Sequence, residues 1–212
     1  PRRKLGEVFP KLTQLIGAWR EEFKRDAMPF GVVQLAAFQE VSDDPAQGGW
    51  SDLRVAQAAV ARAVPKTGLA VTLDVGDAKD IHPRDKRTVG QRLANWALAA
   101  EFGRAIPASS PVAVAIEPAT VDGAKALRVR FEHAEGLAAR AASQPDGFGI
   151  AGADGRFVWA KARVDGQSIL VWSPDVAEPV EVAYAWQNNP VRANVVNGAG
   201  LPAGPFRMTT RR

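Results

Sequence analysis

The sequence predicts an α/β region with a parallel sheet over roughly the first half of the chain, followed by an all-β sandwich. In the first half, helical and strand patterns alternate, which is typical of a parallel α/β sheet. In the second half, short apolar runs are separated by Gly, Asp and Pro, which is typical of antiparallel strands. With 212 residues, of which 46% are hydrophobic and 24% charged, the chain is long enough for two small domains.

The first half contains three amphipathic patterns and two nearly continuous apolar runs. Apolar residues spaced three and four apart predict helices, and short continuous apolar runs predict strands buried on both faces. Two strands are too few for a stable sheet, so further strands must come from elsewhere. The expected elements are a helix at 5–23, a strand at Phe30–Phe38, a helix capped by Ser51, a strand at Gly68–Leu73 and a helix at Arg87–Phe102.

The pattern changes after Gly103, where Ala105–Pro111 is expected to form a compact linker. Three Asp-Gly pairs beyond it favour hairpin turns, at Asp122-Gly123, Asp154-Gly155 and Asp165-Gly166. The expected strands are Val112–Ile116, Ala126–Phe131, Phe148–Ala151, Phe157–Val164, Ser168–Trp172 and Val180–Trp186.

Composition excludes several classes of protein. Because the chain has no cysteine, it has no disulfide, thiolate metal site, iron–sulfur cluster or cysteine nucleophile. No apolar run approaches the roughly 18 uncharged residues of a membrane span. The net charge is +4, and the only short basic clusters lie at the ends, in Arg2-Arg3-Lys4 and Arg211-Arg212. Nucleic-acid binders concentrate basic residues on one face, so we predict neither a nucleic-acid nor a membrane partner.

The densest cluster of polar residues is the loop Asp74–Lys86, directly after the second expected strand. Open α/β sheets bind their ligands at the carboxyl ends of the strands. In this loop, Asp80 and His82 combine an imidazole that can act as a general base with a carboxylate that can orient it. The alternatives are a solvated loop whose Asp residues cap the next helix, or a metal site, which the lack of a second nearby His disfavours.

Other polar and aromatic residues are weaker candidates. None of the serines lies in a Gly-x-Ser-x-Gly turn, so a serine that acts with His82 is expected outside this chain. The second histidine, His133, is expected on the surface. Structural hydrogen bonds around the sheet, rather than substrate contacts, are expected for the polar group Gln34, Trp50, Arg54 and Gln57. Core packing between the sheets, rather than a sugar-stacking platform, is expected for Trp159, Trp172 and Trp186.

The loop and the helix after it resemble a known family. The segment from Asp74 to Ala94 resembles the D-x-GD-x-x-DIHP-x-x-K-x-x-VG-x-RLA region of the sialate O-acetylesterases, SGNH-type hydrolases that deacetylate carbohydrates. Other segments agree in the same order along the chain: Phe9-Pro10-x-Leu12, Trp50-x-x-Leu53-Arg54-x-Ala56-Gln57, Ala183-Tyr184-Ala185-Trp186-x-Asn188-x-Pro190 and Gly200-Leu201-Pro202-Ala203.

The resemblance implies a fold, a reaction and a site. The fold is α/β: residues 1–106 would be the C-terminal portion of an SGNH (flavodoxin-like) parallel-sheet hydrolase domain, and residues 107–212 a β-sandwich accessory domain. The reaction would be removal of acetyl groups from sugar hydroxyls by a serine–histidine–aspartate mechanism, with no cofactor and no metal. The family's base corresponds to His82. The usual acid of the superfamily lies three residues earlier, where this chain has Lys79, so we assign the acid to Asp80, with Asp77 as the alternative.

Two blocks of the family are missing from this sequence, the Gly-x-Ser block with the nucleophile and the Gln-Gly-Glu-x-Asn block. We therefore expect Pro1 to mark a proteolytic nick or a gap in a longer protein, whose serine-bearing N-terminal fragment stays docked as a partner. The rival hypothesis is a non-catalytic carbohydrate-binding or scaffold chain. The resemblance implies a periplasmic or secreted protein and an acetylated carbohydrate substrate. It leaves open whether that substrate is a sialic acid or a plant-wall glycan such as xyloglucan or xylan.

Overall fold

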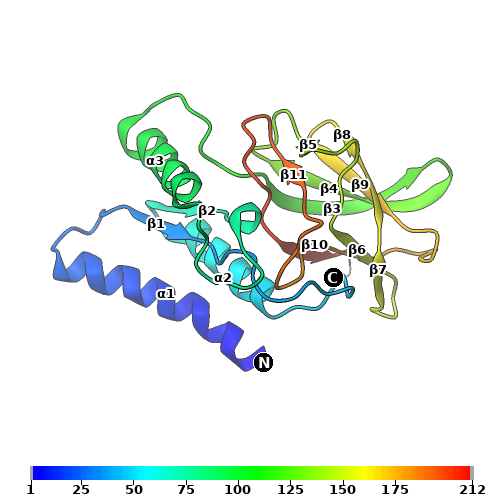
Figure 1. Cartoon of the computed structure of the whole chain (residues 1–212), viewed down its shortest axis with the longest axis horizontal. Coiled ribbons are helices and arrows are strands. Elements are labelled where there is room, and N and C mark those ends of the chain that lie inside the picture. The colour runs from blue at the N-terminus through cyan, green and yellow to red at the C-terminus, as the bar shows by residue number, and fades with distance from the viewer. Residues whose placement is uncertain (1, 211–212) are drawn as a thin grey trace.

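The computed structural model describes residues 2–210, with side chains from Gly6 onward. Pro1, Arg211-Arg212 and the side chains of Arg2-Arg3-Lys4 therefore lie outside what the structure describes. Helices and one small parallel sheet form the first part, and a β-rich part lies beside it (Figure 1). No helix in the described range is both long and apolar enough to cross a membrane.

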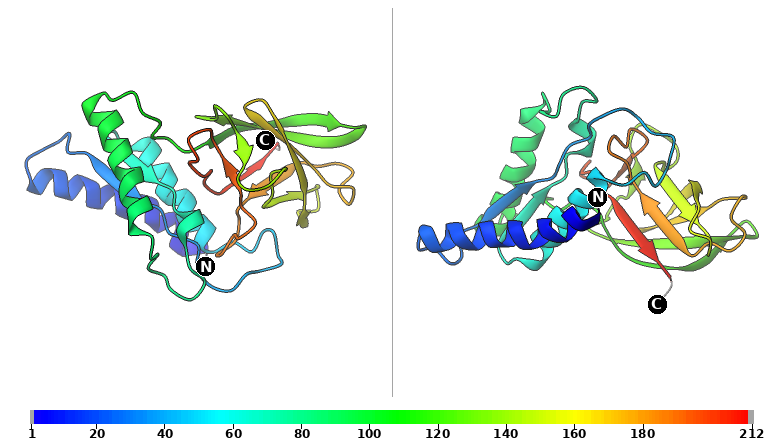
Figure 2. Two further views of the ribbon diagram at one scale, coloured as in Figure 1. Left: turned by 45° about the horizontal axis from the view of Figure 1, so that its top comes forward. Right: turned by 90° about the horizontal axis from the view of Figure 1, so that it is seen from below.

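The first part is a layered arrangement of helices around a pair of parallel strands. In chain order its elements are α1 (Arg2–Glu22), β1 (Phe30–Val33), α2 (Trp50–Ala63), β2 (Thr67–Ala70), a 3₁₀ turn (Leu73–Val75) and α3 (Lys86–Phe102). Strands β1 and β2 pair in parallel, with Phe30 opposite Thr67 and Val33 opposite Ala70. Helix α3 lies on one side of this pair, and α1 and α2 lie on the other (Figures 1 and 2).

Strand β1 is shorter than the predicted strand Phe30–Phe38, because side chains from α2 bind the backbone beyond Val33. The Leu35 N–H donates to Gln57 Oε1 at 3.0 Å, and the Leu35 carbonyl accepts from Arg54 Nε at 2.8 Å. Backbone groups that are bonded to these side chains cannot pair with a neighbouring strand. The apolar run therefore continues as an irregular segment that is held against α2.

The cap of α2 also differs from the prediction. Gly49, not Ser51, is the N-cap residue, and its N–H donates to Asp52 Oδ2 at 2.9 Å. The carboxylate of Asp52 reaches back to satisfy one of the free N–H groups at the start of the helix. Ser51 instead lies fully buried in the first turn.

Helix α3 packs on the strands through a tryptophan that lies over two glycines. A Cβ atom placed on Gly68 would come within 2.1–2.3 Å of the Trp96 indole, and one placed on Gly31 would meet Leu93 at 2.8 Å. The absence of side chains at these two positions therefore lets the helix approach the sheet closely.

We expect Gly68→Ala to lower the free energy of unfolding by about 1–3 kcal/mol, because the added methyl group would push the rigid Trp96 ring and α3 away from the sheet. Urea denaturation measures this effect. Gly90→Ala is the matched control: Gly90 lies in α3, and a Cβ atom placed on it would meet no atom within 4 Å, so alanine there should stabilise the helix by up to about 1 kcal/mol. Equal effects of the two substitutions would contradict the close packing.

The β-rich part contains two four-stranded antiparallel sheets, ordered β12-β10-β6-β7 and β3-β4-β9-β8, and a small pair, β11-β5. The predicted hairpins at the three Asp-Gly pairs are confirmed, since β3 pairs with β4, β6 with β7 and β8 with β9. The strands are β3 (Val112–Val121), β4 (Ala124–Glu132), β5 (Ala138–Ala139), β6 (Phe148–Ala151), β7 (Phe157–Trp159), β8 (Lys161–Asp165), β9 (Ser168–Trp172), β10 (Glu181–Tyr184), β11 (Val195–Val196) and β12 (Phe206–Thr209).

The predicted strand Phe157–Val164 is two strands, β7 and β8, in different sheets. The Ala160 N–H still bonds to the Phe148 carbonyl at 3.0 Å, whereas Lys161 pairs with Trp172 of the other sheet. The chain thus crosses between the sheets at Ala160, and the alternation of side chains along the sequence does not reveal that crossing.

The two four-stranded sheets share one hydrophobic core, and the first part of the chain contributes to it. Fully buried side chains come from both sheets, among them Val129 and Ile150. Val71 and Leu73, which follow β2, belong to the same cluster. The polar loop that begins at Asp74 therefore starts from a rigid core. The division into domains 1–106 and 107–212 stays a prediction.

Candidate active site

The polar loop predicted as the site follows β2 and ends at the start of α3. Its carboxylates form local hydrogen bonds: Asp77 Oδ1 accepts from the Lys79 N–H at 2.8 Å. At the end of the loop Asp85 caps α3, with the Thr88 N–H 2.9 Å from Asp85 Oδ1. One alternative interpretation of this loop was that its Asp residues cap the next helix. Asp85 has that capping role.

His82 and Asp80 are in contact in this loop. The distance from His82 Nδ1 to Asp80 Oδ1 is 3.3 Å, and the same oxygen accepts from the His82 N–H at 2.8 Å. That backbone hydrogen bond, helped by the imidazole, lowers the pKa of Asp80. Among the described side chains no hydrogen bond or ion pair joins Asp77 to His82, so the geometry favours Asp80 as the partner of the imidazole.

The pair is open to solvent, since the His82 side chain is 82% exposed and that of Asp80 44%. An imidazole whose Nδ1 faces a carboxylate presents Nε2 for proton transfer. In the described part of the chain His82 forms no hydrogen bond with a serine, and no group of three or more His, Asp and Glu residues is arranged to hold a metal. The assignment of His82 and Asp80 as catalytic stays a prediction.

The sequence interpretation missed a buried ionic network at the base of this loop. Both Asp74 oxygens bind Arg92: Nη1 lies 2.7 Å from Oδ1, and Nη2 lies 2.7 Å from Oδ2. Arg140, from the β-rich part, adds a bond of 2.6 Å to Oδ2. The Asp74 side chain is only 7% exposed. Asp74 and Arg92 both lie in the family-like motif, whereas nothing in the sequence points to Arg140.

The ionic network predicts a pH-dependent contribution to stability. Burial raises the pKa of Asp74, but the bonds and charges of Arg92 and Arg140 outweigh burial, and the pKa is lowered overall. A lowered folded-state pKa stabilises the fold at a pH above the unfolded value of about 3.9, and this stabilisation is lost as the pH falls through the folded value. We expect Asp74→Asn to lower the free energy of unfolding by about 2–4 kcal/mol at pH 7 and by less at pH 3. Urea denaturation at both values measures this, and an equal cost at both would contradict it.

Arg54 is a second buried charged residue, and the sequence did not reveal its burial or its partners. Its side chain is fully buried and has no carboxylate partner in the described structure. Four carbonyl groups accept from it instead, those of Leu35, Ala36, Gln187 and Asn188, at 2.6–2.8 Å. Burial lowers the pKa of Arg54 to about 10, so it stays charged at neutral pH. Arg54 thereby joins the segment after β1 to the segment after β10.

The side chains of Gln34, Arg54 and Gln57 form the structural hydrogen bonds around the sheet that the sequence predicts, whereas Trp50 bonds through its backbone. Besides Arg54, Gln57 bonds to Leu35, Gln34 Nε2 donates to the Arg54 carbonyl at 3.1 Å, and the Trp50 N–H donates to Asn188 Oδ1 at 2.9 Å. These bonds hold the segment between β1 and α2 in place.

The three tryptophans of the β-rich part do not form one platform. Trp186 is buried, and Trp172 packs against a small apolar cluster on the outer face of its sheet. Trp159 is half-buried, with its Nε1–H bonded to the Asp43 carbonyl at 2.9 Å and Arg192 stacked 4.1 Å from its ring. Trp159 lies on β7 and Trp172 on β9, in different sheets, and neither belongs to the core that the two sheets share. The prediction of core packing between the sheets is therefore wrong for these two residues.

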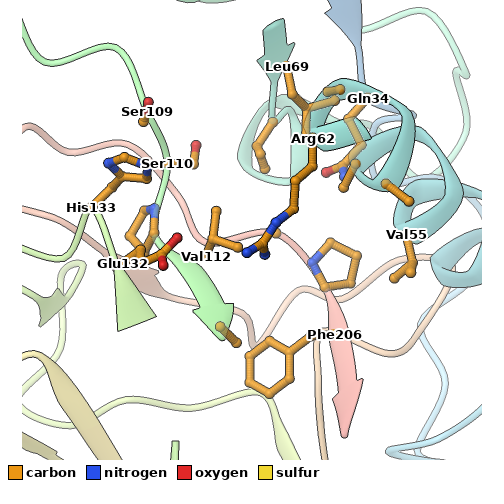
Figure 3. A pocket seen from close by; sticks show the side chains of 18 of the residues that line it. Gln34, Val55, Arg62, Leu69, Ser109, Ser110, Val112, Glu132, His133 and Phe206 are labelled. Atoms are coloured by element: carbon orange, nitrogen blue, oxygen red, sulfur yellow. The ribbon is translucent and has the colours of Figure 1, made fainter. Parts of the chain in front are cut away.

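A cavity of about 490 Å³ lies between α2, β2 and the β-rich part, away from the His82 loop. Figure 3 shows its lining, with the Arg62 side chain reaching into it and His133, Glu132 and Ser109 on the opposite wall. His133 is exposed, as predicted. Neither His82 nor Asp80 lines this cavity, so it does not belong to the candidate active site.

Comparisons with known proteins find relatives of the chain in sequence and in structure. No family model matches the chain. The sialate O-acetylesterases of Pongo abelii and Homo sapiens are each 36% identical to it over 112 residues, which covers 45% of this chain. The crystal structure of a novel carbohydrate acetylesterase from Xanthomonas citri superposes with a TM-score of 0.87, at 38% identity and over 97% of this chain.

The chain thus has the fold of part of a carbohydrate acetylesterase over nearly its whole length. Its resemblance to the sialate O-acetylesterases, which the motif around His82 indicates, is confirmed. The alignment spans 20% of the length of these curated relatives and 46% of the solved chain.

Proposed function

We propose that this chain is the histidine-bearing part of a carbohydrate O-acetylesterase. The observation that carries the proposal is the His82–Asp80 contact of 3.3 Å on an exposed loop after a parallel strand, in a chain that superposes on a carbohydrate acetylesterase. Ligands of open α/β sheets bind at this end of the strands. The substrate class is an acetylated carbohydrate, and export to the periplasm or the exterior belongs to the same proposal.

The proposed reaction is hydrolysis in two steps. His82 Nε2 takes the proton of a serine hydroxyl while the serine oxygen attacks the acetyl carbonyl, and His82 then returns the proton to the sugar oxygen as the ester bond breaks. Water, activated by the same imidazole, hydrolyses the acetyl-serine to acetate. Asp80 orients the ring through Nδ1 and stabilises the imidazolium. Hydrogen-bond donors on the serine-bearing segment would bind the oxyanion, and each would lower the free energy of the transition state by roughly 3 kcal/mol.

The serine-bearing N-terminal segment is the proposed partner, and the open side of the parallel pair supports its docking. Among the described residues β1 pairs only with β2. Beside that free edge Val33 is 43% exposed, and Trp19 of α1 and Phe23, the residue after α1, are more than half exposed. A parallel strand is normally buried on both faces, so further strands of an SGNH-type sheet would pair with β1 and cover these side chains.

Reconstitution tests the function. The open reading frame upstream of Pro1 is searched for a Gly-x-Ser block, and the segment that carries it is co-expressed with this chain. We expect co-elution in size exclusion and acetate release from 4-nitrophenyl acetate and from an acetylated glycan, sensitive to a serine-directed sulfonyl fluoride. This chain alone should release none. Carbohydrate binding by the co-eluting pair without acetate release would instead establish the rival, non-catalytic function.

A further inference from the structure

The loop that carries His82 is fixed at its base and free at its tip. At the base, Asp74 binds Arg92 of α3 through two parallel hydrogen bonds of 2.7 Å, which joins the first residue of the loop to the helix after it. Arg92 Nη1 also donates to the Val71 carbonyl at 2.6 Å. A bidentate guanidinium–carboxylate pair that is almost fully buried holds both groups in one orientation.

The middle of the loop rests on the segment after β1. The Gln39 N–H donates to the Ala78 carbonyl at 3.1 Å. A Cβ atom on Gly76 would lie 2.2 Å from the Ala37 carbonyl oxygen, so the two backbones are in direct contact. Beyond Ala78, Asp80 of its own loop is the one described side chain with which His82 forms a hydrogen bond or ion pair. The position of the imidazole therefore depends on how the base of the loop is held.

One of the groups that hold the base comes from the β-rich part. Arg140 follows β5, and its own N–H bonds to the Asn194 carbonyl at 2.7 Å, which fixes its backbone beside β11. Its guanidinium lies 2.6 Å from Asp74 Oδ2 and is 43% exposed. Arg140 is thus a direct ionic link between the β-rich part and the start of the His82 loop.

We propose that Asp74 and Arg140 are positioning residues. Through them the β-rich part holds the His82 loop in the position in which the imidazole can react. This inference rests on the proposed function. Since Arg92 holds Asp74 on its own through two bonds, loss of Arg140 leaves the fold intact but lets the base of the loop shift. A displacement of about 1 Å in a catalytic group costs up to about 100-fold in rate.

The test compares Arg140→Met with Arg163→Met in the reconstituted enzyme. Arg163 is the matched control because it also pairs with one aspartate, Asp122, and is 49% exposed. Asp122 lies in the turn of the β3–β4 hairpin, which points away from the helices (Figure 1). We expect Arg140→Met to lower kcat about 10- to 100-fold, with KM and the melting temperature nearly unchanged. Arg140→Lys, which keeps a charge beside Asp74, should recover most of the loss, and Arg163→Met should have no effect.

Amide hydrogen exchange over residues 76–83 gives a second readout that does not depend on catalysis. We expect it to rise about tenfold in Arg140→Met and to stay at the wild-type rate in Arg163→Met. Wild-type exchange and wild-type kcat in Arg140→Met would overturn the inference, as would an equal rise in exchange over the whole chain. If the unsubstituted enzyme releases no acetate, the proposed function fails, and the exchange rates still decide whether Arg140 holds the loop.

Discussion

Replacing His82 with alanine in the reconstituted enzyme is expected to lower kcat by about 1000-fold or more. Without the imidazole no group removes the proton from the serine, and none returns a proton to the departing sugar oxygen. KM for an aryl acetate should change little, because the imidazole acts on the reacting atoms rather than on the rest of the substrate. Initial rates with 4-nitrophenyl acetate measure the effect.

His133→Ala is the control, because His133 is the other histidine, is exposed and lies outside the loop. The kcat of His133→Ala should stay within about twofold of wild type, since His133 lines the separate cavity, to which neither His82 nor Asp80 belongs. Near-normal activity in His82→Ala would remove the assignment of the base.

The two candidates for the acid, Asp80 and Asp77, should differ in their effect on kcat in the same assay. Asp80→Asn is expected to cost less than His82→Ala but clearly more than Asp77→Asn. Asp80 contacts His82 Nδ1, whereas Asp77 bonds to the Lys79 backbone. An uncharged amide at position 80 still contacts the ring but no longer stabilises the imidazolium. Equal losses for the two changes would contradict the choice of Asp80 as the acid.

The largest effect on stability is expected at Arg54. Arg54→Ala should lower the free energy of unfolding by about 3–5 kcal/mol, because it leaves a cavity and the four carbonyl groups that the guanidinium now satisfies. Two of these carbonyls belong to the β-rich part, so the contact between the two parts should weaken as well. Urea denaturation, followed by tryptophan fluorescence, measures the loss.

Arg62→Ala is the matched control for Arg54→Ala. Arg62 lies on the same helix, two turns further on, and is exposed. Its replacement should change stability by less than about 0.5 kcal/mol. A similar loss for both substitutions would mean that the buried guanidinium does not hold the two segments together.

Local patterns were sufficient to predict most of the elements. The three helices follow from apolar residues spaced three and four apart, and the hairpins follow from the Asp-Gly pairs, because these features depend on neighbours along the chain. The predicted C-terminal end of β1 was wrong, and the crossing at Ala160 and the strands β5, β11 and β12 were not predicted, since all of these depend on partners that are distant in sequence.

The candidate pair itself could also be found from the sequence. Asp80 and His82 are two residues apart, so a turn alone brings them into contact, and the motif around them is specific enough to indicate the family. The residues that hold their loop could not all be found this way. Arg140 lies 66 positions after Asp74, and only the packing of β5 and β11 beside the loop brings the two together.

The sequence by itself thus determined the order of the three helices and of most strands, the His82–Asp80 pair and the resemblance to carbohydrate acetylesterases. Only the tertiary structure decided which charged side chains are buried and which groups they bind. Burial of an ion is tolerated only where partners converge on it from several segments, and no local pattern encodes that convergence. Arg54, with carbonyls from two parts of the chain, and Asp74, with two guanidinium groups, are the positions where that physical condition is met.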